Sequence, residues 1–171
     1  RIQKKLKRTG AKVTIVDPNA YMTYQPFLPE AAAGSLDPRH IVVPLRGVLK
    51  HCEVISGRVT GIRHNNHVAR IAPPEGDAFD FEYDMLVFAG GSVARTLPIP
   101  GLPEVGIGLK SIQEAEYLRN HVLSRLDAAS STVDAAHRAK ALTFLVIGGG
   151  FAGIECLGEV DDLARSACRT H

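Results

Sequence analysis

A run of strand-forming residues leads directly into a glycine-rich loop in the last fifth of this 171-residue chain. Residues 142–147 are largely apolar, and Gly148, Gly150 and Gly153 follow them in a G-x-G-x-x-G spacing. In this spacing the first glycine allows a sharp turn, the second lets the backbone approach a pyrophosphate, and the third lets helix and strand pack closely. Residues 151–168 have helical periodicity, so a helix N-terminus is predicted to present its N–H groups to phosphates. The pattern indicates a dinucleotide-binding loop.

The segment that follows this loop is short. Only 18 residues follow Gly153, whereas the βαβ unit to which such a loop belongs has about 30 residues. The chain also begins with Arg1 rather than Met. We therefore expect a fragment that is cut at both ends, in which the nucleotide site begins but is not completed.

The start of the chain has the features of the second half of another dinucleotide unit. Residues 1–8 are good helix formers, Gly10 is placed to end a helix, and residues 13–16 are β-prone. Asp17 follows this strand directly. An acidic residue in this place accepts hydrogen bonds from an adenosine ribose. We interpret Asp17 as ribose-binding, with the first strand and its glycine loop belonging to residues before Arg1.

The middle of the chain is predicted to be rich in β structure. A loop over residues 21–29 precedes a short helix over 28–33 that ends at Gly34, and another short helix is predicted near Pro44. Alternation predicts strands at 54–55, 58–63, 67–71 and 79–83, with a tight turn at Asn65–Asn66. The apolar runs 85–88 and 142–147 predict strands that are buried on both faces.

A long amphipathic helix is predicted after a linker. Prolines and glycines crowd residues 98–106, which indicates a domain crossing. Ser111 and Glu114 then form a capping box. Apolar spacings of three and four predict that these helical residues face inward: Ile112, Ala115, Leu118, Val122, Leu126 and Ala129. The same spacing places Ile154, Leu157, Val160 and Ala164 inward on the helix after the glycine loop.

Composition excludes several classes of protein. The net charge is +2, and the one dense basic stretch, within residues 1–8, is interpreted as the solvated face of a helix, which argues against nucleic acid as a partner. No apolar run approaches the 18 to 20 or so residues that cross a bilayer. The three cysteines form no C-x-x-C pair, so we interpret them as free thiols in a reducing compartment. His64 and His67 flank a predicted turn and are not interpreted as metal ligands, so no metal is expected.

Five stretches, taken in order, give the chain a resemblance to a known family. They are residues 13–17, 24–29, 57–62, 83–92 and 148–155. The chain resembles the flavoproteins of the pyridine nucleotide-disulfide oxidoreductase superfamily, and most closely the type II NADH dehydrogenases. The resemblance implies an α/β fold of two nested Rossmann-like domains, both incomplete here. Residues 1–105 would form the FAD-binding domain with its β-rich insertion, and residues 106–171 the first half of the NAD(P)H-binding domain.

The resemblance also implies roles for particular residues. Asp17 would bind the FAD ribose, Val59 would contact the adenine through its backbone, and Tyr24, Gln25 and Pro26 would lie near the flavin. Ala89, Gly90 and Gly91 would approach the flavin, although the family usually has Thr where this chain has Gly90. The residues expected to hold NADH or NADPH are Gly148, Gly149, Gly150, Phe151, Ala152 and Gly153. Glu155 would face the nicotinamide, and stabilisation by the first helical turn explains it equally well; no other catalytic candidate is assigned.

The expected activity is passage of a hydride from NAD(P)H to FAD and then of electrons to a quinone or another acceptor. Without a C-x-x-C pair, a dithiol relay has no candidate. Three alternatives stay open: a sulfide:quinone oxidoreductase that uses Cys156, a ferredoxin-type flavin reductase, and a non-catalytic nucleotide-binding module. We expect a cytoplasmic protein, or one at the cytoplasmic face of a membrane held through a missing C-terminal part, and a homodimer stays open. The fragment alone is expected to be inactive.

Overall fold

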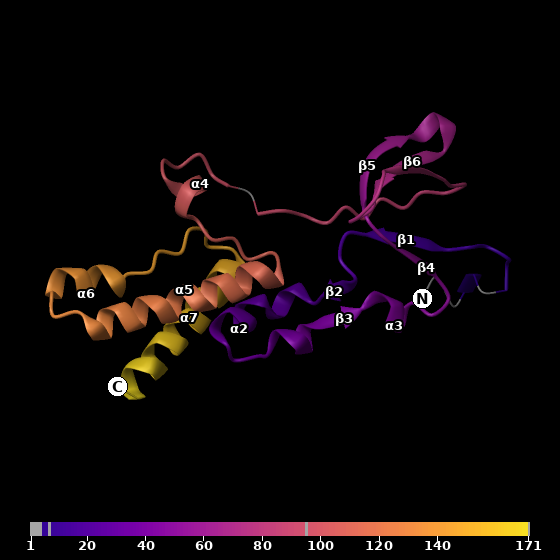
Figure 1. The fold of residues 1–171 in the computed structure, drawn as a ribbon. Coiled ribbons are helices and arrows are strands. Elements are labelled where there is room, and N and C mark those ends of the chain that lie inside the picture. Colours follow the sequence, from indigo (N-terminus) through magenta and orange to yellow (C-terminus); the bar gives the residue numbers. More distant parts are fainter. Residues whose placement is uncertain (1–4, 7, 95, 171) are drawn as a thin grey trace. The chain divides into compact units, whose positions relative to one another are not determined.

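The structure, a computed structural model, describes residues 5–6, 8–94 and 96–170 (Figure 1). The chain divides into two units. The first contains the residues up to Met22 together with Val42–Gly91, and the second contains Thr23–Ile41 together with the residues from Ser92 onward. Of the helix expected over residues 1–8, residues 1–4 and 7 lie outside the described residues, and Lys5 and Leu6 are helical.

A parallel pair of strands begins the first unit. β1 (Thr14–Asp17) pairs with β4 (Glu53–Ser56), with Thr14 opposite Glu53 and Asp17 opposite Ser56. The pair is reinforced at one end, because Glu53 Oε2 lies 2.8 Å from Lys12 Nζ and accepts a 3.2 Å hydrogen bond from Thr14 Oγ1. These contacts lower the pKa of the Glu53 carboxyl. The strand predicted at the start of the chain is therefore confirmed.

An antiparallel sheet follows in the same unit. It consists of β5 (Arg58–Arg63), β6 (Val68–Ala72) and β7 (Phe79–Glu82), paired in that order. The predicted turn is a short 3-10 helix, η3 (His64–Asn66). Alternation along β6 buries Ala69 and Ile71. On the opposite face, the Asp80 carboxylate forms ion pairs with Arg63 and, at 3.1 Å, with Arg70. The expected β-rich middle of the chain is confirmed.

The loop expected over residues 21–29 has more regular structure than the sequence indicated. Tyr21–Thr23 form β2, which pairs with β3 (Val42–Pro44), and Gln25–Phe27 form the 3-10 helix η1. Strand pairing with a segment some 20 residues away is not visible in local composition. The short helix near Pro44 is confirmed as α3 (Leu45–Val48).

Helices dominate the second unit. Besides η1, they are α2 (Leu28–Ala33), η2 (Pro38–Ile41), α4 (Leu102–Val105), α5 (Ile112–Ser131), α6 (Ala135–Ala141) and α7 (Phe151–Thr170). α2 ends at Gly34 in the left-handed conformation (φ 78°), as predicted. The capping box of Ser111 and Glu114 is also present. None of the helices among the described residues is long and apolar enough to cross a membrane.

The core of the second unit combines small side chains with larger apolar ones such as Leu28 and Ile41. α2 packs against both α5 and α7 (Figure 1). Ala31 and Ala32 of α2 and Ala115 and Val122 of α5 are completely buried. Alanines allow two helix backbones to approach closely, so this contact depends on shape as well as on apolar area. The predicted inward face of α5 is confirmed at Ile112, Ala115, Val122 and Ala129.

Two predicted strands are absent from the structure. Residues 85–88 and 142–147 form no strand, and Met85 and Leu145 are each 84% exposed. A strand needs a neighbour for its backbone N–H and C=O groups, and no described strand pairs with either run. The prediction that these runs are buried strands is therefore wrong for this chain as described.

Two further expectations need correction. On α7, Val160 is buried, but Ile154 and Leu157, which were expected to face inward, are exposed because no sheet covers that face among the described elements. The proline-rich linker contains the short helix α4, which starts with Pro103 in its first turn. The domain boundary between residues 105 and 106 stays a prediction; the two units divide the chain differently, because Thr23–Ile41 packs with the residues after 92.

Substitution Ala115→Leu should destabilise the second unit, because a larger side chain at this buried position separates α2 from α5. We expect the free energy of unfolding, measured by urea titration with circular dichroism, to fall by about 1–3 kcal/mol. Ala128→Leu is the matched control, since Ala128 is exposed on the same helix, and should change it by about 0.5 kcal/mol or less. Equal effects of the two variants would contradict the packing described.

The Asp80 ion pairs should make the first unit sensitive to acid. Hydrogen bonds from Arg63 and Arg70 lower the pKa of Asp80 in the folded state. Their contribution is therefore complete above about pH 4 and is lost as the pH falls through the lowered pKa. We expect Asp80→Asn to flatten the acid limb of the stability curve measured by urea titration, whereas Asp77→Asn should keep the wild-type slope. A wild-type slope in Asp80→Asn would refute the assignment.

Candidate functional site

The glycine loop between residue 147 and α7 makes a tight turn into the helix. Gly148 has φ +115°, a conformation that residues with a side chain rarely adopt. A Cβ atom at Gly153 would lie 2.2 Å from the carbonyl oxygen of Gly148, so only glycine fits there. The N–H groups of Gly153 and Ile154 both donate to the carbonyl of Gly150 at 3.0 Å. The conformation of Gly148 and the crowding at Gly153 therefore both require glycine, while the roles expected for these residues in nucleotide binding stay predictions.

The middle of the same loop is open. A Cβ atom at Gly149 or Gly150 would meet no atom within 4 Å, and Phe151 and Ala152 are exposed. The first N–H groups of a helix lack partners inside the helix and face outward from its start. A pyrophosphate can therefore approach this backbone without a side chain in its path, which fits a dinucleotide.

Two residues of the first turns of α7 differ in their surroundings. Glu155 is exposed, so it is free to face a ligand or solvent. Cys156 is half-buried, and burial raises the pKa of its thiol. A raised pKa reduces the thiolate fraction at neutral pH and with it the reactivity of the cysteine. None of the three cysteines, Cys52, Cys156 and Cys168, forms a disulfide within the described part of the chain.

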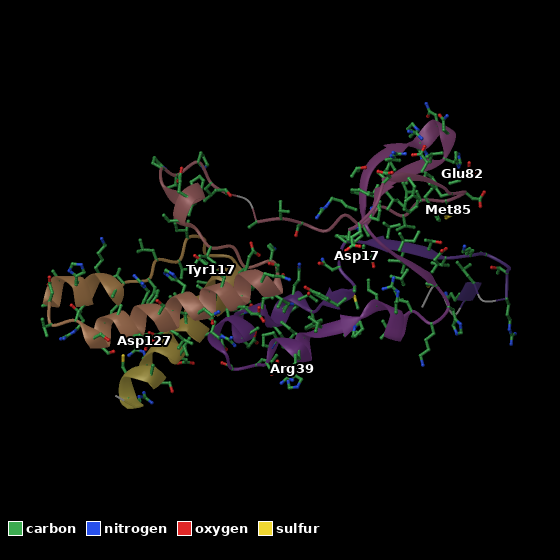
Figure 2. The ribbon with its side chains drawn as sticks, in the orientation of Figure 1. Asp17, Arg39, Glu82, Met85, Tyr117 and Asp127 are labelled. Carbon is green, nitrogen blue, oxygen red and sulfur yellow. The ribbon has the colours of Figure 1, made fainter. Side chains whose placement is uncertain are left out.

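Asp17 lies where β1 ends (Figure 2). Its Oδ1 atom accepts a 2.7 Å hydrogen bond from the N–H of Asn19, which fixes the carboxylate in a turn. Its carbonyl accepts a 3.0 Å hydrogen bond from the N–H of Gly57. That second bond brings the start of β5, and with it Val59, to the end of β1. The structure thus brings together the two residues expected at the adenosine.

The segment Ala89–Gly91 has no regular secondary structure and is exposed, in the same unit as Asp17. Gly91 has φ +70°. A Cβ atom at Gly90 would lie 2.7 Å from Cζ of Phe88, so the Phe88 ring occupies the space that the threonine of the family would need. Where the family usually has a threonine, this chain therefore has Gly90, with the Phe88 ring in the space of the threonine side chain.

The loop of Tyr24, Gln25 and Pro26 belongs to the second unit, with the glycine loop. The Tyr24 and Phe27 rings meet edge to face with centroids 5.0 Å apart, and both side chains are exposed. α2 follows the loop directly and packs on α7, which begins at the glycine loop. A hydrogen bond that sequence reasoning missed connects the residues after α2 to α7: Ser35 Oγ donates to Glu159 Oε2 at 2.8 Å. A separation of 124 residues leaves no local signal for it.

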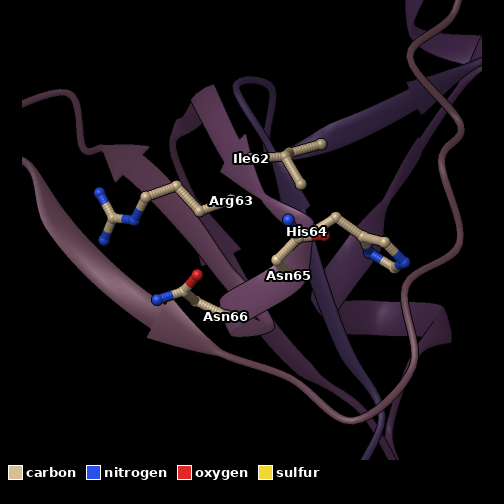
Figure 3. Close-up of a pocket in the computed structure, with 5 residues that line it drawn as sticks. All are labelled: Ile62, Arg63, His64, Asn65 and Asn66. Carbon is tan, nitrogen blue, oxygen red and sulfur yellow. The ribbon is translucent and has the colours of Figure 1, made fainter.

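An open, polar hollow of about 370 Å³ lies at the tip of the β5–β6 hairpin (Figure 3). The side chains of Arg63, His64 and Asn66 spread around the tip instead of converging on one point (Figure 3). Nδ1 of His64 lies 3.1 Å from the Tyr83 hydroxyl, and Nδ1 of His67 lies 3.1 Å from the Tyr83 carbonyl. Within the described part of the chain, no three His, Cys, Asp or Glu side chains gather as metal ligands would.

A parallel strand pair with an acidic residue at its end, and a glycine loop opening a helix, define a dinucleotide-binding α/β protein. The sequence profile of the pyridine nucleotide-disulphide oxidoreductase family matches residues 1–168, and the chain belongs to this family. Its resemblance to type II NADH dehydrogenases is confirmed by curated relatives.

Two bacterial relatives and one from yeast illustrate the match. The type II NADH:quinone oxidoreductase Ndh of Mycobacterium tuberculosis is 32% identical over 95% of this chain and 35% of its own length. A type II NADH:quinone oxidoreductase of Staphylococcus haemolyticus is 31% identical over 100% of this chain and 41% of its own. The external alternative NADH-ubiquinone oxidoreductase of Yarrowia lipolytica is 29% identical over 97% of this chain and 30% of its own length. The chain therefore spans about a third of the length of these relatives.

Solved structures show the same fold. NDH2 from Plasmodium falciparum in complex with RYL-552 superposes with a TM-score of 0.89 at 23% identity, covering 95% of this chain and 34% of that one. An NAD-dependent persulfide reductase from A. fulgidus gives a TM-score of 0.71 at 23% identity, covering 95% and 29%. These likenesses confirm the predicted α/β, Rossmann-like fold class.

Substitution Gly153→Ala should distort the turn into α7, because its methyl group would collide with the Gly148 carbonyl. We expect the free energy of unfolding, from urea titration, to fall by about 1–3 kcal/mol. Gly158→Ala is the matched control on the same helix, where a Cβ atom meets nothing within 4 Å, and should raise it by up to about 1 kcal/mol. A neutral Gly153→Ala would show that the loop is not packed as described.

Proposed function

We propose that the whole protein is an FAD-dependent NADH:quinone oxidoreductase. The observation that carries the proposal is the glycine loop at the start of α7, which is shaped for a dinucleotide and lies in a chain related to type II NADH:quinone oxidoreductases. Bound FAD would accept a hydride from NADH and pass electrons on to the quinone. The protein's own residues bind and orient the two nucleotides.

The residues present fit these two ligands. For NADH or NADPH, the open backbone of residues 148–152 and the start of α7 supply N–H donors without a side chain in the way. For FAD, Asp17 ends β1 beside the start of β5, so its carboxylate would accept hydrogen bonds from the ribose while the Val59 backbone would contact the adenine. Tyr24, Gln25, Pro26 and the exposed segment Ala89–Gly91 would lie at the flavin.

A quinone is favoured as acceptor over the thiol-dependent alternatives. The cysteines among the described residues form no disulfide, and burial raises the pKa of Cys156, the candidate for sulfide chemistry. A protonated thiol is a poor nucleophile. Since quinones partition into lipid, we expect the whole protein to meet its acceptor at a membrane surface, on the cytoplasmic side. Glu155, exposed near the glycine loop, would lie beside the nicotinamide.

The proposal is tested on the protein in its full natural length. We expect it to purify with flavin, recognised by its visible absorbance, and to oxidise NADH with a soluble quinone. Gly150→Ala should keep the fold, because a methyl group there meets no protein atom, but should obstruct the pyrophosphate. Its KM for NADH should rise roughly tenfold, which corresponds to about 1.4 kcal/mol. The 171 residues alone are expected to be inactive.

Gly158→Ala, on the same helix but away from its start, should leave the KM unchanged. A colourless protein that still binds NADH would favour the non-catalytic nucleotide-binding module instead. An unaltered KM in Gly150→Ala would remove the glycine loop from the site.

A further inference from the structure

The N-terminus of α5 has more hydrogen bonds than helix capping requires. A capping box needs Ser111 and Glu114 to bond each other's backbone, and both bonds are present, at 3.2 Å and 2.9 Å. Glu114 Oε2 also accepts from the Ser111 hydroxyl at 3.0 Å and from the N–H of Lys110 at 2.7 Å. One carboxylate oxygen thus holds the peptide that precedes the helix.

The other side of that peptide is held by the loop expected at the flavin. Gln25 Nε2 donates a 3.2 Å hydrogen bond to the carbonyl of Lys110. Lys110 is therefore held by Glu114 at its N–H and by Gln25 at its carbonyl. The loop and the helix are 85 residues apart in the sequence, but both belong to the second unit.

The linker before α5 packs closely around the same carboxylate. A Cβ atom at Gly108 would lie 2.4 Å from Glu114 Oε1 and 3.3 Å from Cβ of Ala94. The carboxylate therefore has little space to shift toward the linker. The N–H groups of Lys110 and Ser111 both donate to this carboxylate, so the backbone between them has a fixed orientation. The Lys110 carbonyl, which lies in that backbone, therefore points toward Gln25.

We propose that Gln25 is a positioning residue, which binds the Tyr24–Phe27 loop to the start of α5. In this arrangement Glu114 sets the direction of the Lys110 carbonyl that Gln25 binds. The assignment of this loop to the flavin rests on the proposed function; the fastening itself does not. Its consequence is that the first turn of α5 orders an aromatic loop from a distant part of the sequence.

The test is amide hydrogen exchange of the full chain, followed at Phe27 and Leu28, whose N–H groups donate to the carbonyls of Tyr24 and Gln25. Gln25→Glu replaces the donor with a carboxylate, which cannot donate to a carbonyl. We expect protection factors at these two amides to fall about two- to tenfold at neutral pH. Below about pH 4, where a glutamate side chain is protonated and donates again, they should return to the wild-type values measured at the same pH. Asn120→Asp, the same chemical change at an exposed site on α5, should show neither effect.

A second pair of variants tests Glu114. Glu114→Gln replaces a charged acceptor with a weaker neutral one, and should also lower protection at Phe27 and Leu28, whereas Glu116→Gln, exposed on the same helix, should not. Wild-type protection in Gln25→Glu at every pH, or in Glu114→Gln, would overturn the proposal. Because no nucleotide is added, failure here leaves the proposed oxidoreductase activity standing, and failure of flavin or NADH binding leaves this inference standing.

Discussion

The close contact of α2 with α5 and α7 is the interaction on which the geometry of the second unit depends. Ala31 and Ala32 of α2 and Ala115 of α5 are completely buried, so a larger side chain at any of them would have to displace its neighbours. α2 follows the Tyr24–Phe27 loop, and α7 begins at the glycine loop. One packing contact therefore relates a loop expected at the flavin to a loop expected at the nicotinamide nucleotide. Two hydrogen bonds hold residues 25–35 at their ends: Gln25 donates to the Lys110 carbonyl, and Ser35 donates to Glu159.

Backbone pairing is the second constraint, and it explains why some strand-forming sequence is not in strands. β1 has β4 as a neighbour, and the parallel pair places Asp17 at its end beside the start of β5. Residues 85–88 and 142–147 are largely apolar, but no described strand pairs with them, so they form no strand and most of their side chains are exposed. The chain covers about a third of its curated relatives. The family is nonetheless evident, because glycine loop, acidic strand end and antiparallel insertion occur in the order that the family has.

Local signals predicted the elements that local physics determines. The capping box at Ser111, the left-handed stop at Gly34 and the alternation along β6 depend on residues within a few positions of one another, and all three are present. The strand β2 and the exposed face of α7 at Ile154 were missed, since pairing and burial depend on elements that are distant or not among those described. Of the candidate site, the strained and crowded glycines follow from the motif, but the Gln25 and Ser35 contacts, across 85 and 124 residues, carry no local pattern.

The sequence by itself determined that this is an α/β chain with a dinucleotide loop of the pyridine nucleotide-disulphide oxidoreductase family, because glycine spacing and periodicity report backbone conformation directly. Only the tertiary structure decided which predicted residues meet. It joined Asp17 to the start of β5, placed the Tyr24–Phe27 loop with α5 and α7, and left Met85 and Leu145 uncovered. The physical reason is that packing and strand pairing are properties of neighbours in space, and these neighbours are dozens of residues apart in the chain.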